Sequence, residues 1–248
     1  VANGIRFVTT SAGDPLLFTG RLHDAGITVF HVVGTLAAAK KAVDAGVDGL
    51  VVEGVEGGGF KNRFGASTMV LLPLVAAHVD VPIVAAGGIC DARSMAAAFV
   101  LGAEAVQMGT RLLASSDSPV HGNLKRAVLD ADETATVLLP LDGKRMMRVI
   151  RTAAADSLDA ATSPAERAAA LQRVQRLYFD GDMDASVANT GQVAGRSTTS
   201  HRPPRSSNGR GRGAARCWRP RRSGSGRPKA EPVRDAPGGQ PAAASAAS

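Results

Sequence analysis

The sequence contains few aromatic residues and few cysteines, and both shortages restrict what the protein can be. Aromatic residues make up 4% of the 248 residues, whereas apolar residues make up 44%. A core of that size must be built from Ala, Val, Leu and Ile, as in sheets covered by Ala-rich helices. The two cysteines, Cys90 and Cys217, are too few for a disulfide framework, so we expect a reducing, cytoplasmic location.

Long apolar runs and metal-ligand spacings are also missing. No run of about 18 apolar residues occurs, so we expect no membrane span. The first residues lack a charged stretch followed by an apolar segment, so we expect no secretory signal. His23, His78 and His121 have no acidic or cysteine partners at ligand spacing, and we therefore predict no metal site.

The net charge of +7 belongs to the C-terminal tail alone. Residues 196–248 hold 12 Lys and Arg but only two Asp and Glu, which leaves 17 basic and 20 acidic residues in the body. The body therefore gives no electrostatic reason to expect nucleic acid. The tail is rich in Arg, Pro, Gly and Ser and cannot bury enough apolar surface to fold, so we predict disorder. It is either an arginine-rich RNA-binding arm or a GC-rich gene translated in a shifted frame, and we favour the shifted frame.

Short β-branched runs alternate with Ala-rich stretches in the first half of the chain. Strand starts follow one another at 22, 22, 33 and 23 residues, a rhythm that predicts repeated β/α units with parallel strands. The predicted strands are Ile5–Thr10, Ile27–Val33, Gly49–Glu53, Pro82–Ala86 and Ala105–Met108. The predicted helices are Leu16–Ala25, Leu36–Ala45, Thr68–His78 and Asp91–Leu101.

These elements predict an α/β fold, a partial TIM-type (β/α)8 barrel within residues 1–195. A closed barrel needs about eight strands, and the chain starts at Val1, so we expect that the first strands are missing. An open sheet edge is prone to association, so copies of the chain could form a homo-oligomer. Residues from about 134 to 180 are predicted as an additional, substrate-side segment that includes a small α part. Its expected parts are a strand near Thr136–Leu139, a turn at Asp142-Gly143, a basic extended run to Arg151 and an amphipathic helix at Pro164–Phe179. After this segment we expect a short helix at Met183–Asn189.

Two adjacent predicted strands end in glycine and carry the strongest chemical signal. The segment Pro82–Ile89 closes on Gly87-Gly88, and Ala105–Thr110 closes on Gly109-Thr110. A phosphate needs backbone N–H groups that it can approach closely, which small residues allow. Such glycines could instead only relieve crowding at strand ends, but the pair at this spacing favours a phosphate site of the kind found after the last two strands of a barrel.

A second glycine cluster directly follows another predicted strand. Glu53-Gly54 is followed by Glu56-Gly57-Gly58-Gly59-Phe60, a loop able to lie flat beside a planar ring or to act as a flexible lid. Loops of this kind lie on the C-terminal face of a barrel, where active sites are found.

Together these segments resemble the nitronate monooxygenase family, formerly called 2-nitropropane dioxygenases, and its relative, the flavin-dependent enoyl-acyl-carrier-protein reductase. The resemblance runs from about Gly4 to Gly195, and its most specific part is the two glycine-ended strands. The segments that carry it are Val8–Pro15, Glu53-Gly54, Glu56–Phe60, Ala85–Ile89, Val106–Thr110, Gly181-Asp182 and Gly191–Gly195.

The resemblance implies FMN as the cofactor. The positions implied to contact it are Glu53, Gly58, Gly88, Gln107, Met108, Gly109 and Thr110, with Gly87 as a neighbour. Glu53 stands where many members have Gln, and a carboxylate accepts hydrogen bonds from ring N–H groups but cannot donate one.

The family's catalytic histidine is absent, because Phe60 occupies its place. A phenyl ring cannot act as a base, and the loss of a general base lowers rates by roughly 10²–10⁴-fold, so the catalytic residue stays unknown. Lys61 is either an electrostatic partner for an anionic substrate or a solvated loop lysine. His31 either faces the mouth of the barrel or is a hydrogen-bonded structural histidine. We favour the solvated loop lysine for Lys61 and the structural histidine for His31.

The function that the resemblance implies is an FMN-dependent oxidoreductase that oxidises a nitronate or related anion with O₂. A preformed nitronate needs no deprotonation, so this reaction tolerates Phe60. Two alternatives remain open: a reductase of enoyl thioesters that uses NAD(P)H, and a truncated family member without a catalytic role.

Overall fold

The computed structural model describes residues 3–141, 145–159, 163, 165 and 171–196. The predicted turn at Asp142-Gly143, the first part of the helix at Pro164–Phe179 and the predicted tail after Arg196 lie outside the described residues.

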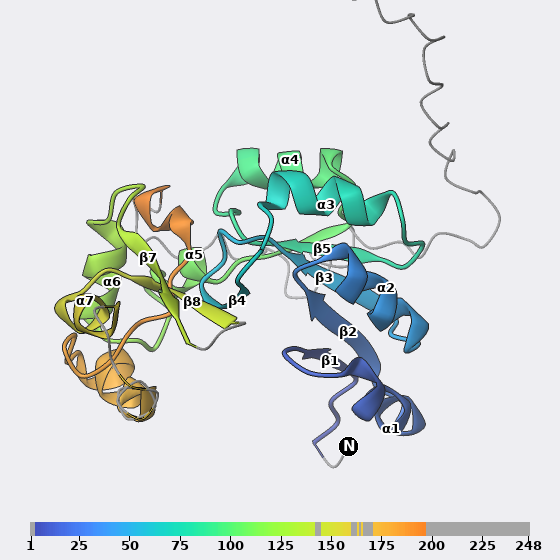
Figure 1. Ribbon diagram of the computed structural model, residues 1–248, viewed down its shortest axis with the longest axis horizontal. Helices are drawn as coiled ribbons and strands as arrows, with labels where there is room; N and C mark the ends of the chain where they lie inside the picture. The colour runs from blue at the N-terminus through green and yellow to red at the C-terminus, as the bar shows by residue number, and fades with distance from the viewer. Residues whose placement is uncertain (1–2, 142–144, 160–162, 164, 166–170, 197–248) are drawn as a thin grey trace, which may run out of the picture.

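Five parallel strands form the larger sheet, in the order β1-β2-β3-β5-β6, and the sheet is curled like half of a barrel (Figure 1). The prediction of an α/β fold built as a partial barrel is therefore confirmed. The strands are β1 (Phe7–Thr10), β2 (Thr28–Val33), β3 (Gly49–Glu53), β5 (Ile83–Ala86) and β6 (Ala105–Gln107). The connecting segments contain η1 (Pro15–Leu17), α1 (Thr19–Asp24), α2 (Leu36–Asp44), α3 (Thr68–Ala76) and α4 (Ala92–Val100).

The two faces of this sheet are buried differently. On the face toward the helices, fully buried side chains such as Leu50, Leu72 and Ile83 form the main core. The inner face of the half-barrel carries a smaller cluster around Phe30 and Val51. Both clusters consist largely of aliphatic side chains, as the low aromatic content predicted.

The register of the parallel strands aligns their carboxyl ends. Glu53 of β3 lies opposite Ala86 of β5, and Ala86 lies opposite Gln107 of β6. The residues that follow these three positions therefore meet at one edge of the sheet, which is the edge where open α/β sheets bind ligands.

A second sheet has three antiparallel strands in the order β4-β8-β7. Its strands are β4 (Gly59–Asn62), β8 (Arg145–Ile150) and β7 (Thr136–Pro140). We interpreted the whole glycine cluster as loop, and that was wrong for its last part, because β4 becomes a strand by pairing with β8. This pairing joins residues more than 80 positions apart, so no local pattern indicates it.

Short helices surround the small sheet (Figure 1). They are α5 (Thr110–Leu113), α6 (Gly122–Leu129), α7 (Ala153–Asp159), the π-helix η2 (Arg176–Asp180) and η3 (Gln192–Arg196). The predicted short helix at Met183–Asn189 is wrong, because this segment forms turns and Asn189 makes an isolated β-bridge with Val149. No helix in the described ranges is both long and apolar enough to cross a membrane.

The helix-side core predicts a large difference between two leucine truncations. Leu72 is fully buried in α3, whereas Leu16 is 64% exposed in η1. Leu72→Ala should lower the free energy of unfolding by about 2–5 kcal/mol, because it leaves a cavity in packed surroundings. Leu16→Ala should change it by less than about 0.5 kcal/mol. Urea unfolding of both variants checks the prediction, and equal losses would contradict it.

Candidate functional site

A cavity of about 290 Å³ lies at the edge where β3, β5 and β6 end, and we call it the glycine cavity. It is lined by Glu53, Glu56, Gly57, Gly58, Ala86, Gly87, Gly88, Ile89, Gln107, Gly109, Thr110, Leu113, Asn189, Gly191 and Val193. The two glycine-ended strands, which lie one β/α unit apart in the sequence, thus meet at a single cavity. A fourth segment, 189–193, completes its wall.

The backbone at Gly88 and Gly109 is suited to a close approach by a ligand, whereas a Cβ at Gly87 would lie 3.0 Å from the carbonyl oxygen of Gly54. Gly87 and Gly88 have φ of +85° and +76°, a conformation that side chains rarely adopt. A Cβ added at Gly109 would meet no atom within 4 Å. Among the described residues, no protein group accepts a hydrogen bond from the backbone N–H of Gly88 or Gly109. Both N–H groups are therefore available to an anion in the cavity.

Thr110 connects the end of β6 to the segment that closes the cavity. Its Oγ1 accepts a hydrogen bond of 2.8 Å from the backbone N–H of Gly191. The hydroxyl proton of Thr110 is therefore directed away from Gly191 and can be donated to a ligand. Next along the chain, the N–H of Gln192 donates to the carbonyl oxygen of Glu56 at 2.9 Å. These two hydrogen bonds hold the closing segment against β6 on one side and the glycine cluster on the other.

Gly58 is required for this contact because there is no room for a side chain. A Cβ at Gly58 would lie 2.8 Å from the backbone nitrogen of Thr190 and 2.9 Å from that of Gly191. Both obstacles are backbone atoms, which cannot rotate away as a flexible side chain can.

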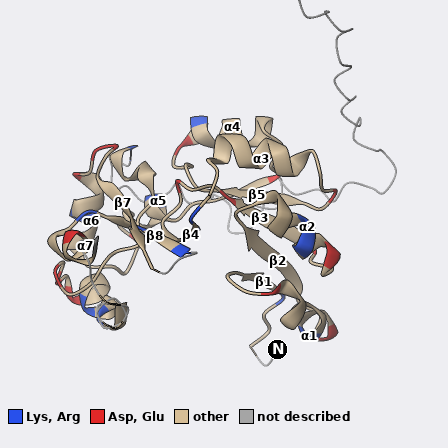
Figure 2. Ribbon diagram, viewed as in Figure 1, with Lys and Arg blue, Asp and Glu red and all other residues tan. Residues whose placement is uncertain are grey.

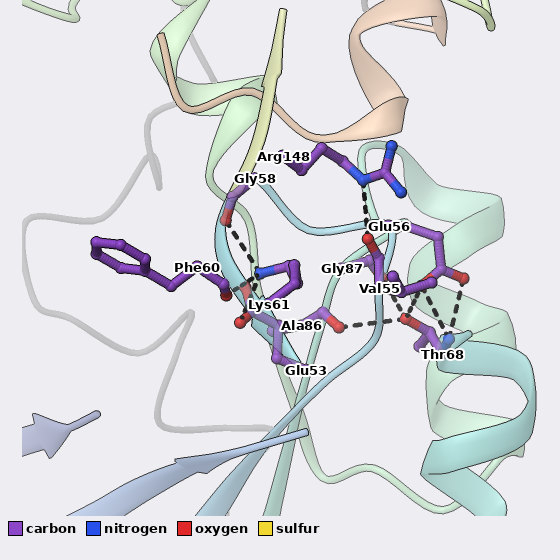
Figure 3. Close-up of polar contacts among 10 residues, drawn as sticks. All are labelled: Glu53, Val55, Glu56, Gly58, Phe60, Lys61, Thr68, Ala86, Gly87 and Arg148. Atoms are coloured by element: carbon purple, nitrogen blue, oxygen red, sulfur yellow. Dashed lines mark hydrogen bonds and ion pairs between the residues drawn. The ribbon is translucent and has the colours of Figure 1, made fainter. Parts of the chain in front are cut away.

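A second cavity of about 330 Å³ lies beside the first, and we call it the Phe60 cavity. It is lined by Ser11, Ala12, Val32, Gly34, Thr35, Ala38, Glu53, Val55, Phe60, Lys61, Asn62, Gly65 and Arg145. Glu53 lines both cavities, so the two share a wall. The ring of Phe60 is 53% exposed and points away from the contact between Lys61 and Glu53 (Figure 3).

Lys61 is buried, so the favoured reading of a solvated loop lysine is wrong. Its side chain is 4% exposed, and its ammonium forms an ion pair with Glu53 (Nζ–Oε2 2.9 Å). The same ammonium donates to the carbonyl oxygens of Gly58 and Phe60, each at 3.1 Å. An ammonium has three N–H donors, and these three acceptors occupy all of them. Lys61 therefore holds the glycine cluster and the Glu53 carboxylate in place.

Glu56 is fixed from the opposite side by α3. Both of its carboxylate oxygens accept hydrogen bonds of 2.9 Å from the backbone N–H of Thr68, the first residue of that helix. The hydroxyl of Thr68 donates to the carbonyl oxygen of Gly87 at 2.9 Å and contacts Glu56 Oε2 at 3.1 Å. Figure 3 shows Thr68 between Glu56 and the end of β5. Thr68 therefore couples the glycine cluster to the glycine pair.

Arg148 of β8 is a buried cation that the sequence reasoning missed. It is 6% exposed, and its Nε–H donates to the carbonyl oxygen of Val55 at 2.9 Å, while Nη1 donates to Thr136 Oγ1 at 3.1 Å. Burial lowers the pKa of Arg148, and the nearby carboxylate of Glu56 opposes that shift. The signal in the sequence was an arginine that alternates with apolar neighbours, Met147 and Val149, within a strand.

The structure brings together seven of the eight residues predicted at the FMN site, including the neighbour Gly87. They line the glycine cavity and are Glu53, Gly58, Gly87, Gly88, Gln107, Gly109 and Thr110. Met108 is not among the lining residues, because its side chain packs against the main core. That these residues bind FMN stays a prediction. In the described part of the chain, no group of three His, Cys, Asp or Glu side chains could hold a metal.

His31 does not face either cavity. It lies on the same face of β2 as Val29 and Val33, which belong to the core under the helices, and it is 6% exposed. Its Nδ1 is 2.8 Å from Thr10 Oγ1, and burial lowers the pKa of its imidazole. The alternative in which His31 faces the mouth of the barrel is therefore wrong, and the hydrogen-bonded structural histidine is confirmed.

Residues 1–202 match the model of the Nitronate monooxygenase family. A curated relative from Mycobacterium tuberculosis, (3aS,4S,5R,7aS)-5-hydroxy-7a-methyl-1-oxo-octahydro-1H-indene-4-carboxyl-CoA dehydrogenase, is 35% identical over 69% of this chain and 49% of its own length. The chain therefore spans about half of that relative.

Two solved structures have the same fold. FabK from Thermotoga maritima has a TM-score of 0.74 at 35% identity, over 80% of this chain and 64% of its own. A nitroalkane oxidase from Streptomyces ansochromogenes has a TM-score of 0.66 at 25% identity, over 87% of this chain and 62% of its own.

Because Gly58 contacts the closing segment with no room for a Cβ, we predict that Gly58→Ala moves the glycine cluster and the segment 189–193 apart. The added methyl group should lower the free energy of unfolding by about 1–3 kcal/mol, as overpacking does. It should also speed hydrogen exchange at the Gly191 amide, because this amide donates a hydrogen bond to Thr110 Oγ1 in the unaltered chain. Gly13→Ala is the matched control, because its Cβ would meet nothing within 4 Å and its φ is not in the left-handed range. Unchanged exchange at Gly191 in the Gly58 variant would contradict the assignment.

Proposed function

The chain belongs to the nitronate monooxygenase family, and we propose that it binds FMN in the glycine cavity and acts as an FMN-dependent oxidoreductase. The observation that carries this proposal is the convergence of three strand ends and the segment 189–193 on that one cavity. Residues 1–195 are the proposed flavin-binding portion.

The lining of the glycine cavity fits the phosphate of FMN. Two backbone N–H groups, at Gly88 and Gly109, have no acceptor within the described residues, and Thr110 has a hydroxyl proton to donate. The absence of side chains at these glycines lets an anion approach the backbone closely. We assign the phosphate to Gly88, Gly109 and Thr110, with Gly87 setting the turn.

The ring of the flavin is assigned to the part of the cavity near Glu53, Gly58 and Gln107. The carboxylate of Glu53 is 22% exposed and can accept hydrogen bonds from ring N–H groups. The amide of Gln107 can both donate and accept. FMN, when bound, supplies the two-electron chemistry, while these residues bind and orient it.

The Phe60 cavity is the proposed substrate site, because it shares the Glu53 wall with the glycine cavity. The proposed substrate is a nitronate, with O₂ as the electron acceptor. A nitronate is already deprotonated, so its oxidation needs no base at position 60. The three donors of Lys61 are occupied, and it therefore acts on this site by fixing Glu53 and the loop.

An acyl thioester is the second candidate substrate. A relative that is 35% identical over most of this chain is named as a dehydrogenase of a carboxyl-CoA compound. The exposed ring of Phe60, together with Val32 and Val55, gives the cavity an apolar side against which a hydrocarbon group can pack. In the alternative of an enoyl thioester reductase, NAD(P)H supplies the two electrons that reduce the substrate.

FMN binding is tested by reconstitution of the full chain and by a charge placed at Gly109. We expect the purified protein to bind FMN near one per chain, with quenched flavin fluorescence and a higher midpoint of thermal unfolding. Free FMN at 100 times its Kd should stabilise the fold by about 2.7 kcal/mol. Gly109→Asp adds a carboxylate where nothing lies within 4 Å, and it should weaken FMN binding by at least about 10-fold, or 1.4 kcal/mol.

Gly109→Asn is the matched control, because Asn has the same shape as Asp without the charge. It should weaken FMN binding less than Asp does, and both variants should unfold at similar urea concentrations. Failure of the unaltered chain to bind FMN would refute the proposal and leave the non-catalytic alternative.

The substrate is tested with a neutral nitroalkane and its preformed nitronate. The unaltered protein should consume O₂ with the preformed nitronate but not with the neutral nitroalkane, because Phe60 cannot remove a proton. Phe60→His should raise the activity toward the neutral compound relative to the nitronate, by up to roughly 10²-fold. Consumption of NAD(P)H with a crotonyl thioester, and no O₂ uptake with the nitronate, would instead establish the second candidate. Phe60→Leu is the matched control, because it removes the aromatic ring without adding a base and should not raise the activity toward the neutral compound.

A further inference from the structure

The glycine cavity is acidic, although it is the proposed site of a doubly charged phosphate. The ionisable side chains that line it are the carboxylates of Glu53 and Glu56, and no Lys or Arg is among its lining residues. In a cavity of this volume, the distances between these carboxylates and a bound phosphate are comparable to the screening length of about 10 Å at 0.1 M salt. Two uncompensated carboxylates would therefore oppose the binding of FMN.

Each carboxylate has a buried cation behind it. Lys61, 4% exposed, contacts Glu53 directly at 2.9 Å. Arg148, 6% exposed, donates to the carbonyl oxygen of Val55, the residue before Glu56, at 2.9 Å. The carboxylate of Glu56 raises the pKa of Arg148 against the larger effect of burial, as a favourable interaction between the two charges requires. Glu56 also receives the N–H of Thr68.

The two cations come from neighbouring strands of the small sheet. Lys61 lies on β4 and Arg148 on β8, and the strands pair so that Gly59 is opposite Arg148. Figure 2 shows basic residues on β4 and β8 of the small sheet, and Figure 3 shows Lys61 and Arg148 reaching different parts of the glycine cluster. The small sheet therefore presents two positive charges to the outer side of the cavity wall, where they do not line the glycine cavity themselves.

We propose that Lys61 and Arg148 are positioning residues that neutralise Glu53 and Glu56 from behind the cavity wall, and thereby allow the cavity to accept the phosphate of FMN. The inference rests on the proposed FMN binding and goes beyond it, because it assigns a role in anion binding to two residues outside the cavity. A charge pair built into the wall leaves the carboxylates free to accept hydrogen bonds while removing their net repulsion.

The test compares FMN with riboflavin, which has the same ring system but no phosphate. The Kd of each is measured by flavin fluorescence quenching with the full chain. In Lys61→Met the affinity for FMN should fall on the order of 10-fold more than the affinity for riboflavin, because only FMN carries the charge that Glu53 repels. The ratio of the two Kd values is the readout, since a damaged ring site would weaken both ligands equally.

A second substitution should restore the ratio. In the double variant Lys61→Met with Glu53→Gln, the wall is neutral again, and the preference for FMN over riboflavin should return to within about threefold of the unaltered chain, a difference of about 0.65 kcal/mol. Arg148→Met with and without Glu56→Gln provides an independent pair. Lys41→Met is the matched control, because Lys41 forms an exposed ion pair with Asp14 away from both cavities and should leave the ratio unchanged.

The outcomes separate this inference from the proposed function. If the unaltered chain binds FMN, equal weakening of both flavins in Lys61→Met and Arg148→Met, or no weakening, overturns the inference and leaves the proposed function standing. If the unaltered chain binds neither flavin, the inference and the proposed function are both refuted. If one of the single variants does not unfold cooperatively in urea, the other cation–carboxylate pair decides the test. Failure of both double variants to recover the ratio of the two Kd values also overturns the inference.

Discussion

The register of the parallel sheet is the constraint on which the site depends. Because Glu53, Ala86 and Gln107 are aligned across β3, β5 and β6, the residues after them meet at one edge. A shift of one residue in either pairing would turn the side chains of that strand to the opposite face. It would move Glu53 or Gln107 from the cavity to the side of the sheet covered by helices. The buried cores on both faces, which favour only this register, therefore position the glycine cavity as well.

The small antiparallel sheet lies behind the glycine cluster that lines the cavity, and it supplies the cations that balance the charge of that wall. It is assembled from β4, which follows β3 directly, and from β7 and β8, which come more than 70 residues later. Burying Lys61 and Arg148 is unfavourable unless their charges are compensated. The carboxylate of Glu53 and the carbonyl oxygen of Gly58 accept from Lys61, and the carbonyl oxygen of Val55 accepts from Arg148. Packing between the sheets and the electrostatics of the cavity are therefore produced by the same contacts.

Several residues were correctly expected from the sequence to meet at the ends of neighbouring strands, for local reasons, and the positions of others were not foreseen. Gly87-Gly88 and Gly109-Thr110 were recognised because strand, glycine and helix follow one another in a fixed order. Lys61 was misread because its burial depends on β8, and the sequence around it has the composition of a loop. The segment 183–189 was misread as a helix because its pairing with Val149 is remote. Arg148 was not considered, since its partner, the carbonyl oxygen of Val55, is 93 residues away in the chain.

By itself, the sequence determined the alternation of strands and helices, the aliphatic core and the glycine-ended strands. These features depend on neighbours along the chain, where hydrophobic period and residue size are sufficient. Only the tertiary structure decided that the glycine cluster ends in a strand, that His31 lies under the helices, and that both carboxylates of the cavity have buried cations behind them. Those outcomes depend on which distant segments pair and which side chains lose water, and neither is encoded in a local pattern.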